Sequence, residues 1–99
     1  MKNPIAQLNK IFDNQIRLGI MSFLMVNDEL SFVELKEQLD VSDGNLATHL
    51  KKLDESNYIK TKKRFVKNKP LTTYAVSTEG RKAFQEHIKA LELMIKQLK

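Results

Sequence analysis

Hydrophobic residues recur every three or four positions along most of this chain, a spacing that predicts amphipathic helices. Asn3 followed by Pro4 predicts the start of a first helix, because proline suits the first helical position. The Asp13–Asn14 pair then either begins a further turn or briefly breaks that helix, and Asn27–Asp28 ends the helical stretch. The stretch is apolar on much of its circumference, so we expect it to be buried between other elements. Its periodic apolar residues are Ile5, Leu8, Ile11, Phe12, Ile16, Ile20, Phe23 and Leu24.

Two shorter helices follow, each after its own start signal. Ser31 and Glu34 have the spacing of a capping box, in which each side chain accepts a hydrogen bond from the other residue's backbone N–H, and they predict a helix over about 32–39. The turn at 40–43 supplies another N-cap for a helix over about 43–56, and Asn57 suits a left-handed residue after it. The expected buried residues of the two helices are Val33, Leu35, Leu39, Leu46, Leu50 and Leu53.

The second half of the chain predicts a β-hairpin and a final helix. Strands are expected over 58–66 and 71–76, with Lys67–Pro70 as the tip, because proline suits a loop and does not suit a central strand. Ser77 caps a helix over about 78–98, and residues 30–32 could form one short strand. The expected fold is mainly α with a β-hairpin, in the order helix, helix, helix, hairpin, helix, as a single domain over residues 1–99.

Positive charge is concentrated in the hairpin. Residues 60–69 hold six Lys and Arg and no acidic residue, whereas the whole chain carries +5, so the rest sums to −1. A basic hairpin beside a polar helix suits the phosphate backbone of a nucleic acid. Lysines also protect exposed strand edges from aggregation, so charge alone leaves both interpretations open.

The preceding helix favours the nucleic-acid interpretation. Two short helices joined by a tight turn and followed by a hairpin make a winged helix-turn-helix, whose second helix can lie in the DNA major groove while the hairpin, or wing, contacts the adjacent backbone or minor groove. With its leucines inward, this helix presents Asn45 and Thr48, which suit base edges, and Lys51, which suits phosphates. His49 lies between the two faces and either contacts DNA or packs on the neighbouring helix. The predicted DNA-binding residues are Ser42, Gly44, Asn45, Thr48, His49, Lys51, Lys52, Lys62, Arg64, Lys67, Asn68 and Lys69.

Three segments resemble known regulators. Residues 12–21 (FDNQIRLGIM) resemble the helix that opens the winged-helix domain of ArsR-type bacterial regulators. Residues 46–59 (LATHLKKLDESNYI) look like the recognition helix and first wing strand shared by ArsR-type and MarR-type regulators, and residues 74–80 (YAVSTEG) are similar to the second wing strand and its junction with the last helix. The resemblance covers about residues 5–91 and implies a homodimeric repressor or activator on a pseudo-palindromic operator. The chain lacks the cysteines with which many ArsR-type proteins sense metals, and it is shorter than MarR-type proteins with effector pockets, so the question of a small-molecule effector stays open.

The last helix has the spacing of a coiled-coil seam, with apolar residues separated by four, three, four and three positions. A lone helix at the end of a small domain cannot bury this whole seam internally, so we expect its first turns to pack internally and its distal part to pair with a second chain. The alternative is that the whole seam packs back on the first helix. The stretch covers only about two heptads, so a free-standing coiled coil would be marginal. The predicted dimerisation residues are Ile5, Leu8, Phe84, Ile88, Leu91, Ile95 and Leu98.

Composition narrows the classes of function that remain for this protein. The absence of cysteine excludes disulfides and thiolate metal sites and fits a reducing cytosol, and no apolar run approaches the ~20 residues of a membrane span. The two histidines fall on different predicted elements, and we find no phosphate-binding loop or nucleophile motif, so we predict neither a metal or cofactor nor an enzyme. The leading hypothesis is a cytoplasmic homodimeric regulator of transcription, with repression favoured, that binds double-stranded DNA. The alternatives are a protein-interaction module whose wing is only a soluble edge, and a protein that binds structured RNA.

Overall fold

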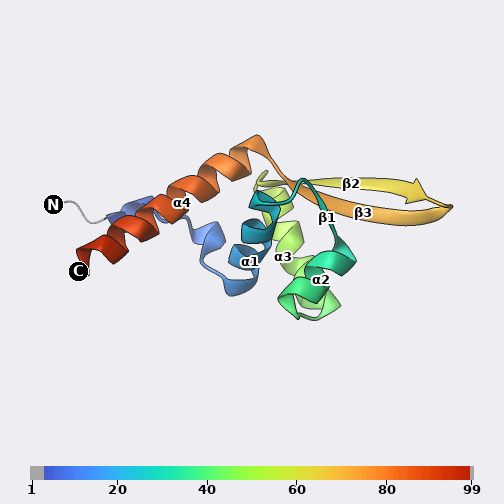
Figure 1. Ribbon diagram of the computed structural model, residues 1–99, viewed down its shortest axis with the longest axis horizontal. Coiled ribbons are helices and arrows are strands. Elements are labelled where there is room, and N and C mark those ends of the chain that lie inside the picture. The colour runs from blue at the N-terminus through green and yellow to red at the C-terminus, as the bar shows by residue number, and fades with distance from the viewer. Residues whose placement is uncertain (1–3, 99) are drawn as a thin grey trace.

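The computed structural model describes residues 4–98 and shows an elongated molecule of 57 × 26 × 21 Å (Figure 1). Three helices and the start of a fourth form a central body, from which a β-hairpin projects at one end and the rest of the fourth helix at the other. The elements are the 3-10 turns η1 (Pro4–Gln7) and η2 (Lys10–Phe12), the helices α1 (Gln15–Met25), α2 (Phe32–Leu39), α3 (Asp43–Glu55) and α4 (Thr78–Gln97), and the strands β1 (Leu30–Ser31), β2 (Ile59–Val66) and β3 (Lys69–Val76).

The N-terminal segment differs from the regular helix that its apolar spacing predicts. It forms the two 3-10 turns, and residues 13–14 interrupt the helical path before α1 begins. The cause is local, because Asn9 Oδ1 accepts the backbone N–H of Ile11 at 2.9 Å and Asn14 Oδ1 accepts that of Ile16 at 3.0 Å. Each asparagine therefore starts a new turn instead of continuing the preceding one. The predicted cap at Asn3 lies outside the described residues, and α1 ends two residues before the predicted stop.

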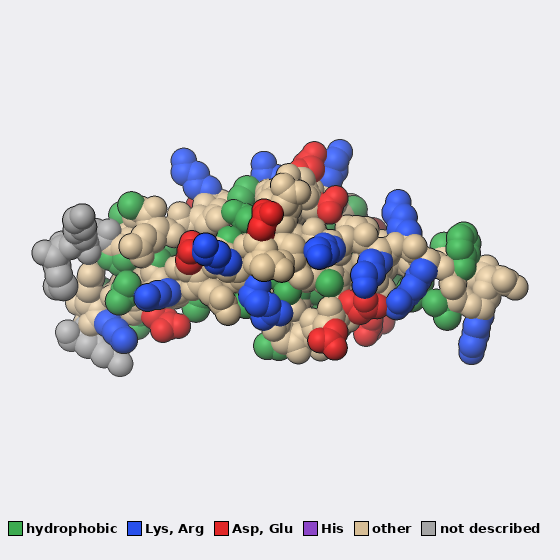
Figure 2. Space-filling view, turned by 90° about the horizontal axis from the view of Figure 1, so that it is seen from above, with side chains coloured by type: hydrophobic (Ala, Val, Ile, Leu, Met, Phe, Trp, Pro, Cys, Tyr) green, Lys and Arg blue, Asp and Glu red, His purple; other side chains and the backbone are tan. Residues whose placement is uncertain are grey.

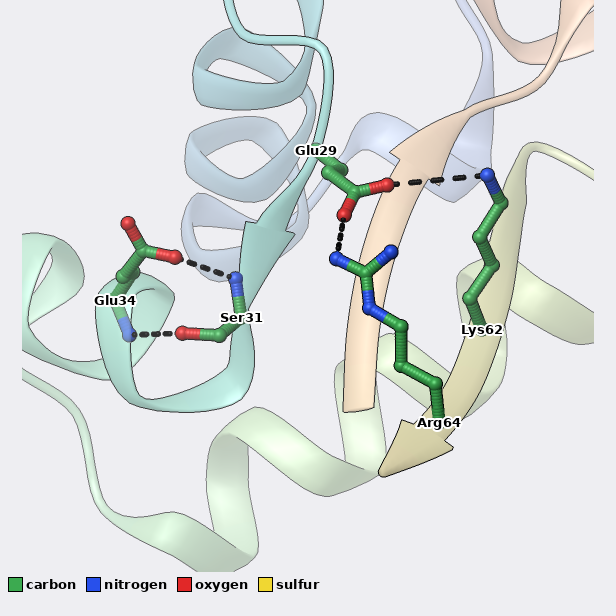
Figure 3. Close-up of polar contacts among 5 residues, drawn as sticks. All are labelled: Glu29, Ser31, Glu34, Lys62 and Arg64. Carbon is green, nitrogen blue, oxygen red and sulfur yellow. Dashed lines mark hydrogen bonds and ion pairs between the residues drawn. The ribbon is translucent and has the colours of Figure 1, made fainter. Parts of the chain in front are cut away.

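The other predicted helix starts are confirmed by their hydrogen bonds. Glu34 N donates to Ser31 Oγ at 3.1 Å and Ser31 N donates to Glu34 Oε1 at 2.9 Å, which completes the capping box of α2 (Figure 3). Ser42 Oγ caps α3, and Ser77 Oγ caps α4 by accepting from the backbone N–H of residue 80. Asn57 adopts the predicted left-handed backbone with φ of 65°, so the chain leaves α3 sharply and enters the hairpin.

The core lies between α1, α2, α3, the hairpin root and the first half of α4. The predicted leucines of α3 are buried, as is Leu35 of α2. Val33, however, is 61% exposed, so its assignment to the core is wrong. It stands two positions before Leu35, about 200° away around the helix, and therefore lies on the opposite side. The fully buried large side chains are Phe12, Ile20, Met21, Leu24, Leu35, Leu46 and Leu53.

The three strands form an antiparallel sheet in the order β1-β3-β2. The hairpin tip is shorter than predicted, because Lys67 and Asn68 form a two-residue turn with φ of 53° and 63°. Two consecutive positive φ values are the signature of the tight turn that matches strand twist. Pro70 therefore belongs to β3 instead of the loop, opposite Phe65. Hydrogen-bonded and non-hydrogen-bonded residue pairs alternate along an antiparallel pair of strands. The pair of Phe65 and Pro70 is the second from the turn and is therefore non-hydrogen-bonded. The missing N–H of the proline thus removes no hydrogen bond between the strands.

Candidate nucleic-acid interface

The outward side of α3 is polar and accessible, as its sequence predicts. Its leucines at 46, 50 and 53 pack inward, which turns the residues between them toward solvent. Every residue of the predicted DNA-binding set is exposed except His49, which is half-buried. The polar side chains of α3 and the basic side chains of the wing are therefore accessible to a partner, with Lys62 and Arg64 on the opposite face of the hairpin from Lys63.

The first half of α3 presents distinct hydrogen-bonding groups. Thr48 Oγ1 donates to the carbonyl of Gly44 at 2.9 Å, so its lone pairs and its methyl group remain for an outside partner. The Asn45 side-chain amide has no hydrogen-bond partner among the described residues, which leaves a donor and an acceptor side by side. An amide of this kind matches the major-groove edge of adenine. Asp43, the acidic residue at this end, is paired with Lys36 at 2.7 Å, which offsets its charge.

His49 occupies the boundary position left open by the sequence. Its Nδ1 lies 2.9 Å from a guanidinium nitrogen of Arg17, and Arg17 Nε also donates to the carbonyl of Ile11. Burial, and secondarily the charge of Arg17, lower the pKa of His49. The ring is therefore a neutral acceptor at neutral pH and ties α3 to α1 and η2.

The wing root and the wing tip differ in how their charges are balanced. Glu29, just before β1, bonds Arg64 at 2.6 Å and lies 3.8 Å from Lys62, so it partly neutralises two predicted contact residues (Figure 3). Within residues 4–98, by contrast, no carboxylate lies at ion-pair distance from Lys63, Lys67 or Lys69. The role of Glu29 could not be predicted from the sequence, because its partners on β2 lie more than 30 positions away and only the pairing of β1 and β2 with β3 brings them together.

A shallow groove of about 380 Å³ separates α3 from the wing. Lys51 lines the groove from α3 and Lys63 lines it from the wing. Asp54 and Thr61 also line it, and Asp54 accepts a long hydrogen bond of 3.5 Å from the Thr61 hydroxyl. Burial, followed by the charge of Asp54, raises the pKa of Tyr74, so this phenol stays protonated. The groove thus has lysines from two elements at its margins and neutral or paired groups at its base.

The predicted dimerisation residues divide along α4. Phe84 is buried against Phe12, with ring centroids 5.2 Å apart, and so belongs to the core of the protomer. Ile88 and Leu91 are half-buried, whereas Ile95 and Leu98 are 56% and 86% exposed. Ile5 and Leu8 of the N-terminal segment line an apolar groove of about 450 Å³ together with Leu18 and Leu91.

His87 lies at the edge of this groove and has a structural partner. Its Nδ1 accepts the backbone N–H of Asn9 at 3.0 Å, and Asn9 Nδ2 donates to the Tyr58 hydroxyl at 2.9 Å. Burial lowers the pKa of His87, and the nearby charge of Asp13 opposes that shift. Across residues 4–98, no three acidic, histidine or cysteine side chains converge as a metal site would require. None of the helices described is both long and apolar enough to cross a bilayer.

Comparison with known proteins gives a consistent classification. Residues 16–95 match the family described as winged helix DNA-binding domain. An uncharacterized protein of Methanocaldococcus jannaschii is 39% identical over 79 residues, which cover 80% of this chain and 86% of that protein. A transcriptional regulator homologue from Pyrococcus horikoshii OT3 has a TM-score of 0.85 and 29% identity, over 91% of this chain and 89% of that chain.

A more distant likeness shows the fold alone. A transcriptional regulator of the MarR family from Enterococcus faecalis V583 has a TM-score of 0.76 at 17% identity, over 90% of this chain and 79% of that chain. Fold and site together define a protein of the winged-helix, DNA-binding class. The chain belongs to the winged helix DNA-binding domain family. The predicted ArsR-type and bacterial character stays a prediction.

Proposed function

We propose that this protein is a cytoplasmic, homodimeric transcriptional regulator that binds double-stranded DNA at a pseudo-palindromic operator and acts as a repressor. The observation that carries the proposal is the joint placement of lysines from α3 and from the wing around one groove, beside an exposed polar face of α3. Lys51 and Lys63 suit phosphates of the duplex backbone, and Asn45 near the start of α3 suits a base edge.

The proposed dimer is supported by the exposed apolar residues of distal α4. A two-fold dimer needs a patch that is complementary to itself, and Ile95 and Leu98 continue the seam that Ile88 and Leu91 begin. Two recognition helices held in this way would contact two half-sites. Repression follows most simply, because a dimer that covers an operator excludes other proteins by occupancy alone.

Selection of bound sequences from a random duplex library tests DNA binding, specificity and symmetry together. We expect inverted half-sites whose centres lie about one helical turn, roughly 10 bp, apart. Recovery of a single asymmetric half-site would contradict the symmetric dimer. Failure to enrich any sequence, together with binding that ignores salt, would favour the protein-interaction module instead.

Substitutions on α3 test the assigned recognition face. Asn45→Ala and Thr48→Ala should each change which sequences are selected and cost about 1–3 kcal/mol at the preferred site if a good base contact is lost. Gln38→Ala, at an exposed position of α2, is the matched control and should leave the selected sequences unchanged. An unchanged preference in both α3 variants would show that another surface reads the DNA.

A further inference from the structure

The wing tip exposes a group of apolar side chains that the basic residues around it do not explain. Phe65 is 77% exposed and Val66 46%, and Pro70, which pairs with Phe65, is also exposed. Figure 2 shows hydrophobic side chains at the wing end of the molecule, interspersed with Lys and Arg. We propose that Phe65, backed by Pro70, is an apolar wedge that enters the DNA minor groove beside the major groove occupied by α3. This inference rests on the proposed DNA binding.

Strand alternation decides the direction in which Phe65 points. Side chains two positions apart share a face of a sheet, so Phe65 lies on the face that carries Thr61 and Lys63. Those two residues line the groove against α3. Phe65 is therefore on the side of the wing from which α3 meets DNA, whereas Val66 lies on the opposite face with Lys62 and Arg64.

The wing is long and stiff enough for the proposed contact. Each of its strands has eight residues, which at about 3.3 Å per residue gives a reach of roughly 26 Å. The two-residue turn closes the hairpin tightly, and Pro70 lies directly opposite Phe65 on the partner strand. A minor groove about 6 Å wide excludes a helix but admits a single side chain from a narrow tip.

Charge around the wedge favours DNA over a protein partner. Lys63 shares the face of Phe65 and Lys67 lies in the turn beyond it, and no carboxylate in the described part of the chain pairs with either lysine. Cations on both sides of an apolar group match the two phosphate rows that border a minor groove. Apolar wedges of this kind partly unstack a base step and kink the duplex, most readily at flexible pyrimidine–purine steps.

A minor-groove wedge predicts a preference that the major groove cannot explain. The 2-amino group of guanine projects into the minor groove, whereas inosine lacks it and keeps the major-groove edge of guanine. We therefore use a fluorescein-labelled synthetic duplex of mixed sequence in three forms, whose A·T, G·C or I·C block lies where the wing reaches. The wild-type protein should bind the A·T and I·C forms more tightly than the G·C form.

Phe65→Ala is the decisive variant, and Val66→Ala is its control on the opposite face. Phe65→Ala should bind about tenfold more weakly, the loss expected when an aromatic side chain no longer leaves water, with an unchanged dependence on salt. It should also lose the preference for A·T and I·C blocks, whereas Val66→Ala keeps both affinity and preference. Phe65→Leu should retain most of the affinity. Circular dichroism checks that all variants are folded, as the exposure of Phe65 leads us to expect.

The outcomes separate this inference from the proposed function. Wild-type protein that binds no duplex overturns the DNA-binding function and the wedge with it. Binding that Phe65→Ala leaves unchanged in strength and preference overturns the wedge alone. An equal loss in Val66→Ala overturns the assignment of the DNA-facing side of the wing.

Discussion

The two ends of this elongated molecule both expose apolar side chains, but the charges around them differ. At the end of α4, Ile95 and Leu98 lie near Glu92 and Lys96, so charges of both signs frame the apolar seam. At the wing tip, the charged residues near Phe65 in the sequence are all basic. The difference indicates which partner each end suits, because a two-fold dimer brings identical surfaces together and a single-sign patch would repel its own copy. A patch of one sign instead suits a polyanion such as DNA.

The buried core lies in the central body, and the two ends hold the surfaces proposed to contact DNA and a second chain. Substitutions in the body should therefore weaken both DNA binding and dimerisation, because they reduce the fraction of protein that is folded. Substitutions at one end should weaken only one of these two activities and leave folding unchanged. Substitutions at each end and in the body can therefore separate folding from DNA binding and dimerisation.

The largest effect is expected at the α4 end. Ile95→Lys combined with Leu98→Lys should give a folded monomer, because both side chains are exposed in the protomer and charges would meet across the seam. Affinity for a full operator should fall by about 10²–10⁴, since the second half-site contact is no longer intramolecular. Sedimentation, circular dichroism and operator titration measure the three quantities.

A matched pair of substitutions controls for added charge. Gln85→Lys with Gln97→Lys introduces the same charge on α4 at exposed positions outside the seam, and it should leave the dimer intact. A stable dimer in the seam variant would place the interface elsewhere, for example on the groove beside η1.

The next effect concerns the junction between the wing and α4. A Cβ on Gly80 would lie 1.9 Å from the carbonyl oxygen of Tyr58, which itself accepts the backbone N–H of Ser77 at 3.0 Å. Gly80→Ala should therefore lower the free energy of unfolding by about 1–3 kcal/mol or more, because backbone must move. Denaturant unfolding measures the change.

Gly44 provides the contrast within the same experiment. A Cβ there meets nothing within 4 Å, so Gly44→Ala should raise the free energy of unfolding by up to about 1 kcal/mol through helix propensity. A Gly80→Ala protein as stable as wild type would show that the junction is not tightly packed.

A smaller effect distinguishes the wing tip from the wing root. Lys67→Ala with Lys69→Ala should weaken binding to all duplexes alike and flatten the log–log salt slope by up to about two units if both residues meet phosphates. Lys62→Ala with Arg64→Ala should change the slope less, because Glu29 already compensates those charges. Equal changes from the two pairs would contradict the division of the wing.

The smallest effect is on stability at mildly acidic pH. Burial lowers the pKa of His87 below its ordinary 6.5 in the folded protein, so the unfolded chain binds the proton more readily. This group therefore leaves stability unchanged above about pH 6.5 and reduces it as pH falls from there toward the lower folded pKa. Urea unfolding at several pH values measures the trend. His87→Gln should flatten it, and an undiminished trend in that variant would assign it to another group, such as His49.

Local features of the fold could be predicted because they depend on residues a few positions apart. The Ser31–Glu34 capping box, the cap at Ser77 and the left-handed Asn57 are all confirmed. The leucine stripe of α3 also follows from helical period, and with it the exposed face that carries Asn45 and Thr48. The error at Val33 arose from treating every apolar residue of a short helix as core, although its period excludes that position.

The sequence by itself therefore determined α2, α3, α4, the hairpin, the excess charge of the wing and the polar face beside it, since local hydrogen bonds and side-chain period decide these. The N-terminal segment is the exception, because it forms 3-10 turns instead of the regular helix that its period predicts. Only the tertiary structure decided which charges remain available, because Glu29 reaches β2 through strand pairing between distant segments. It also decided that Phe84 packs inside the protomer while Ile95 and Leu98 stay exposed, although all three share one heptad pattern. A heptad pattern records that a residue avoids water, and only the arrangement of neighbouring elements decides whether its own chain or another covers it.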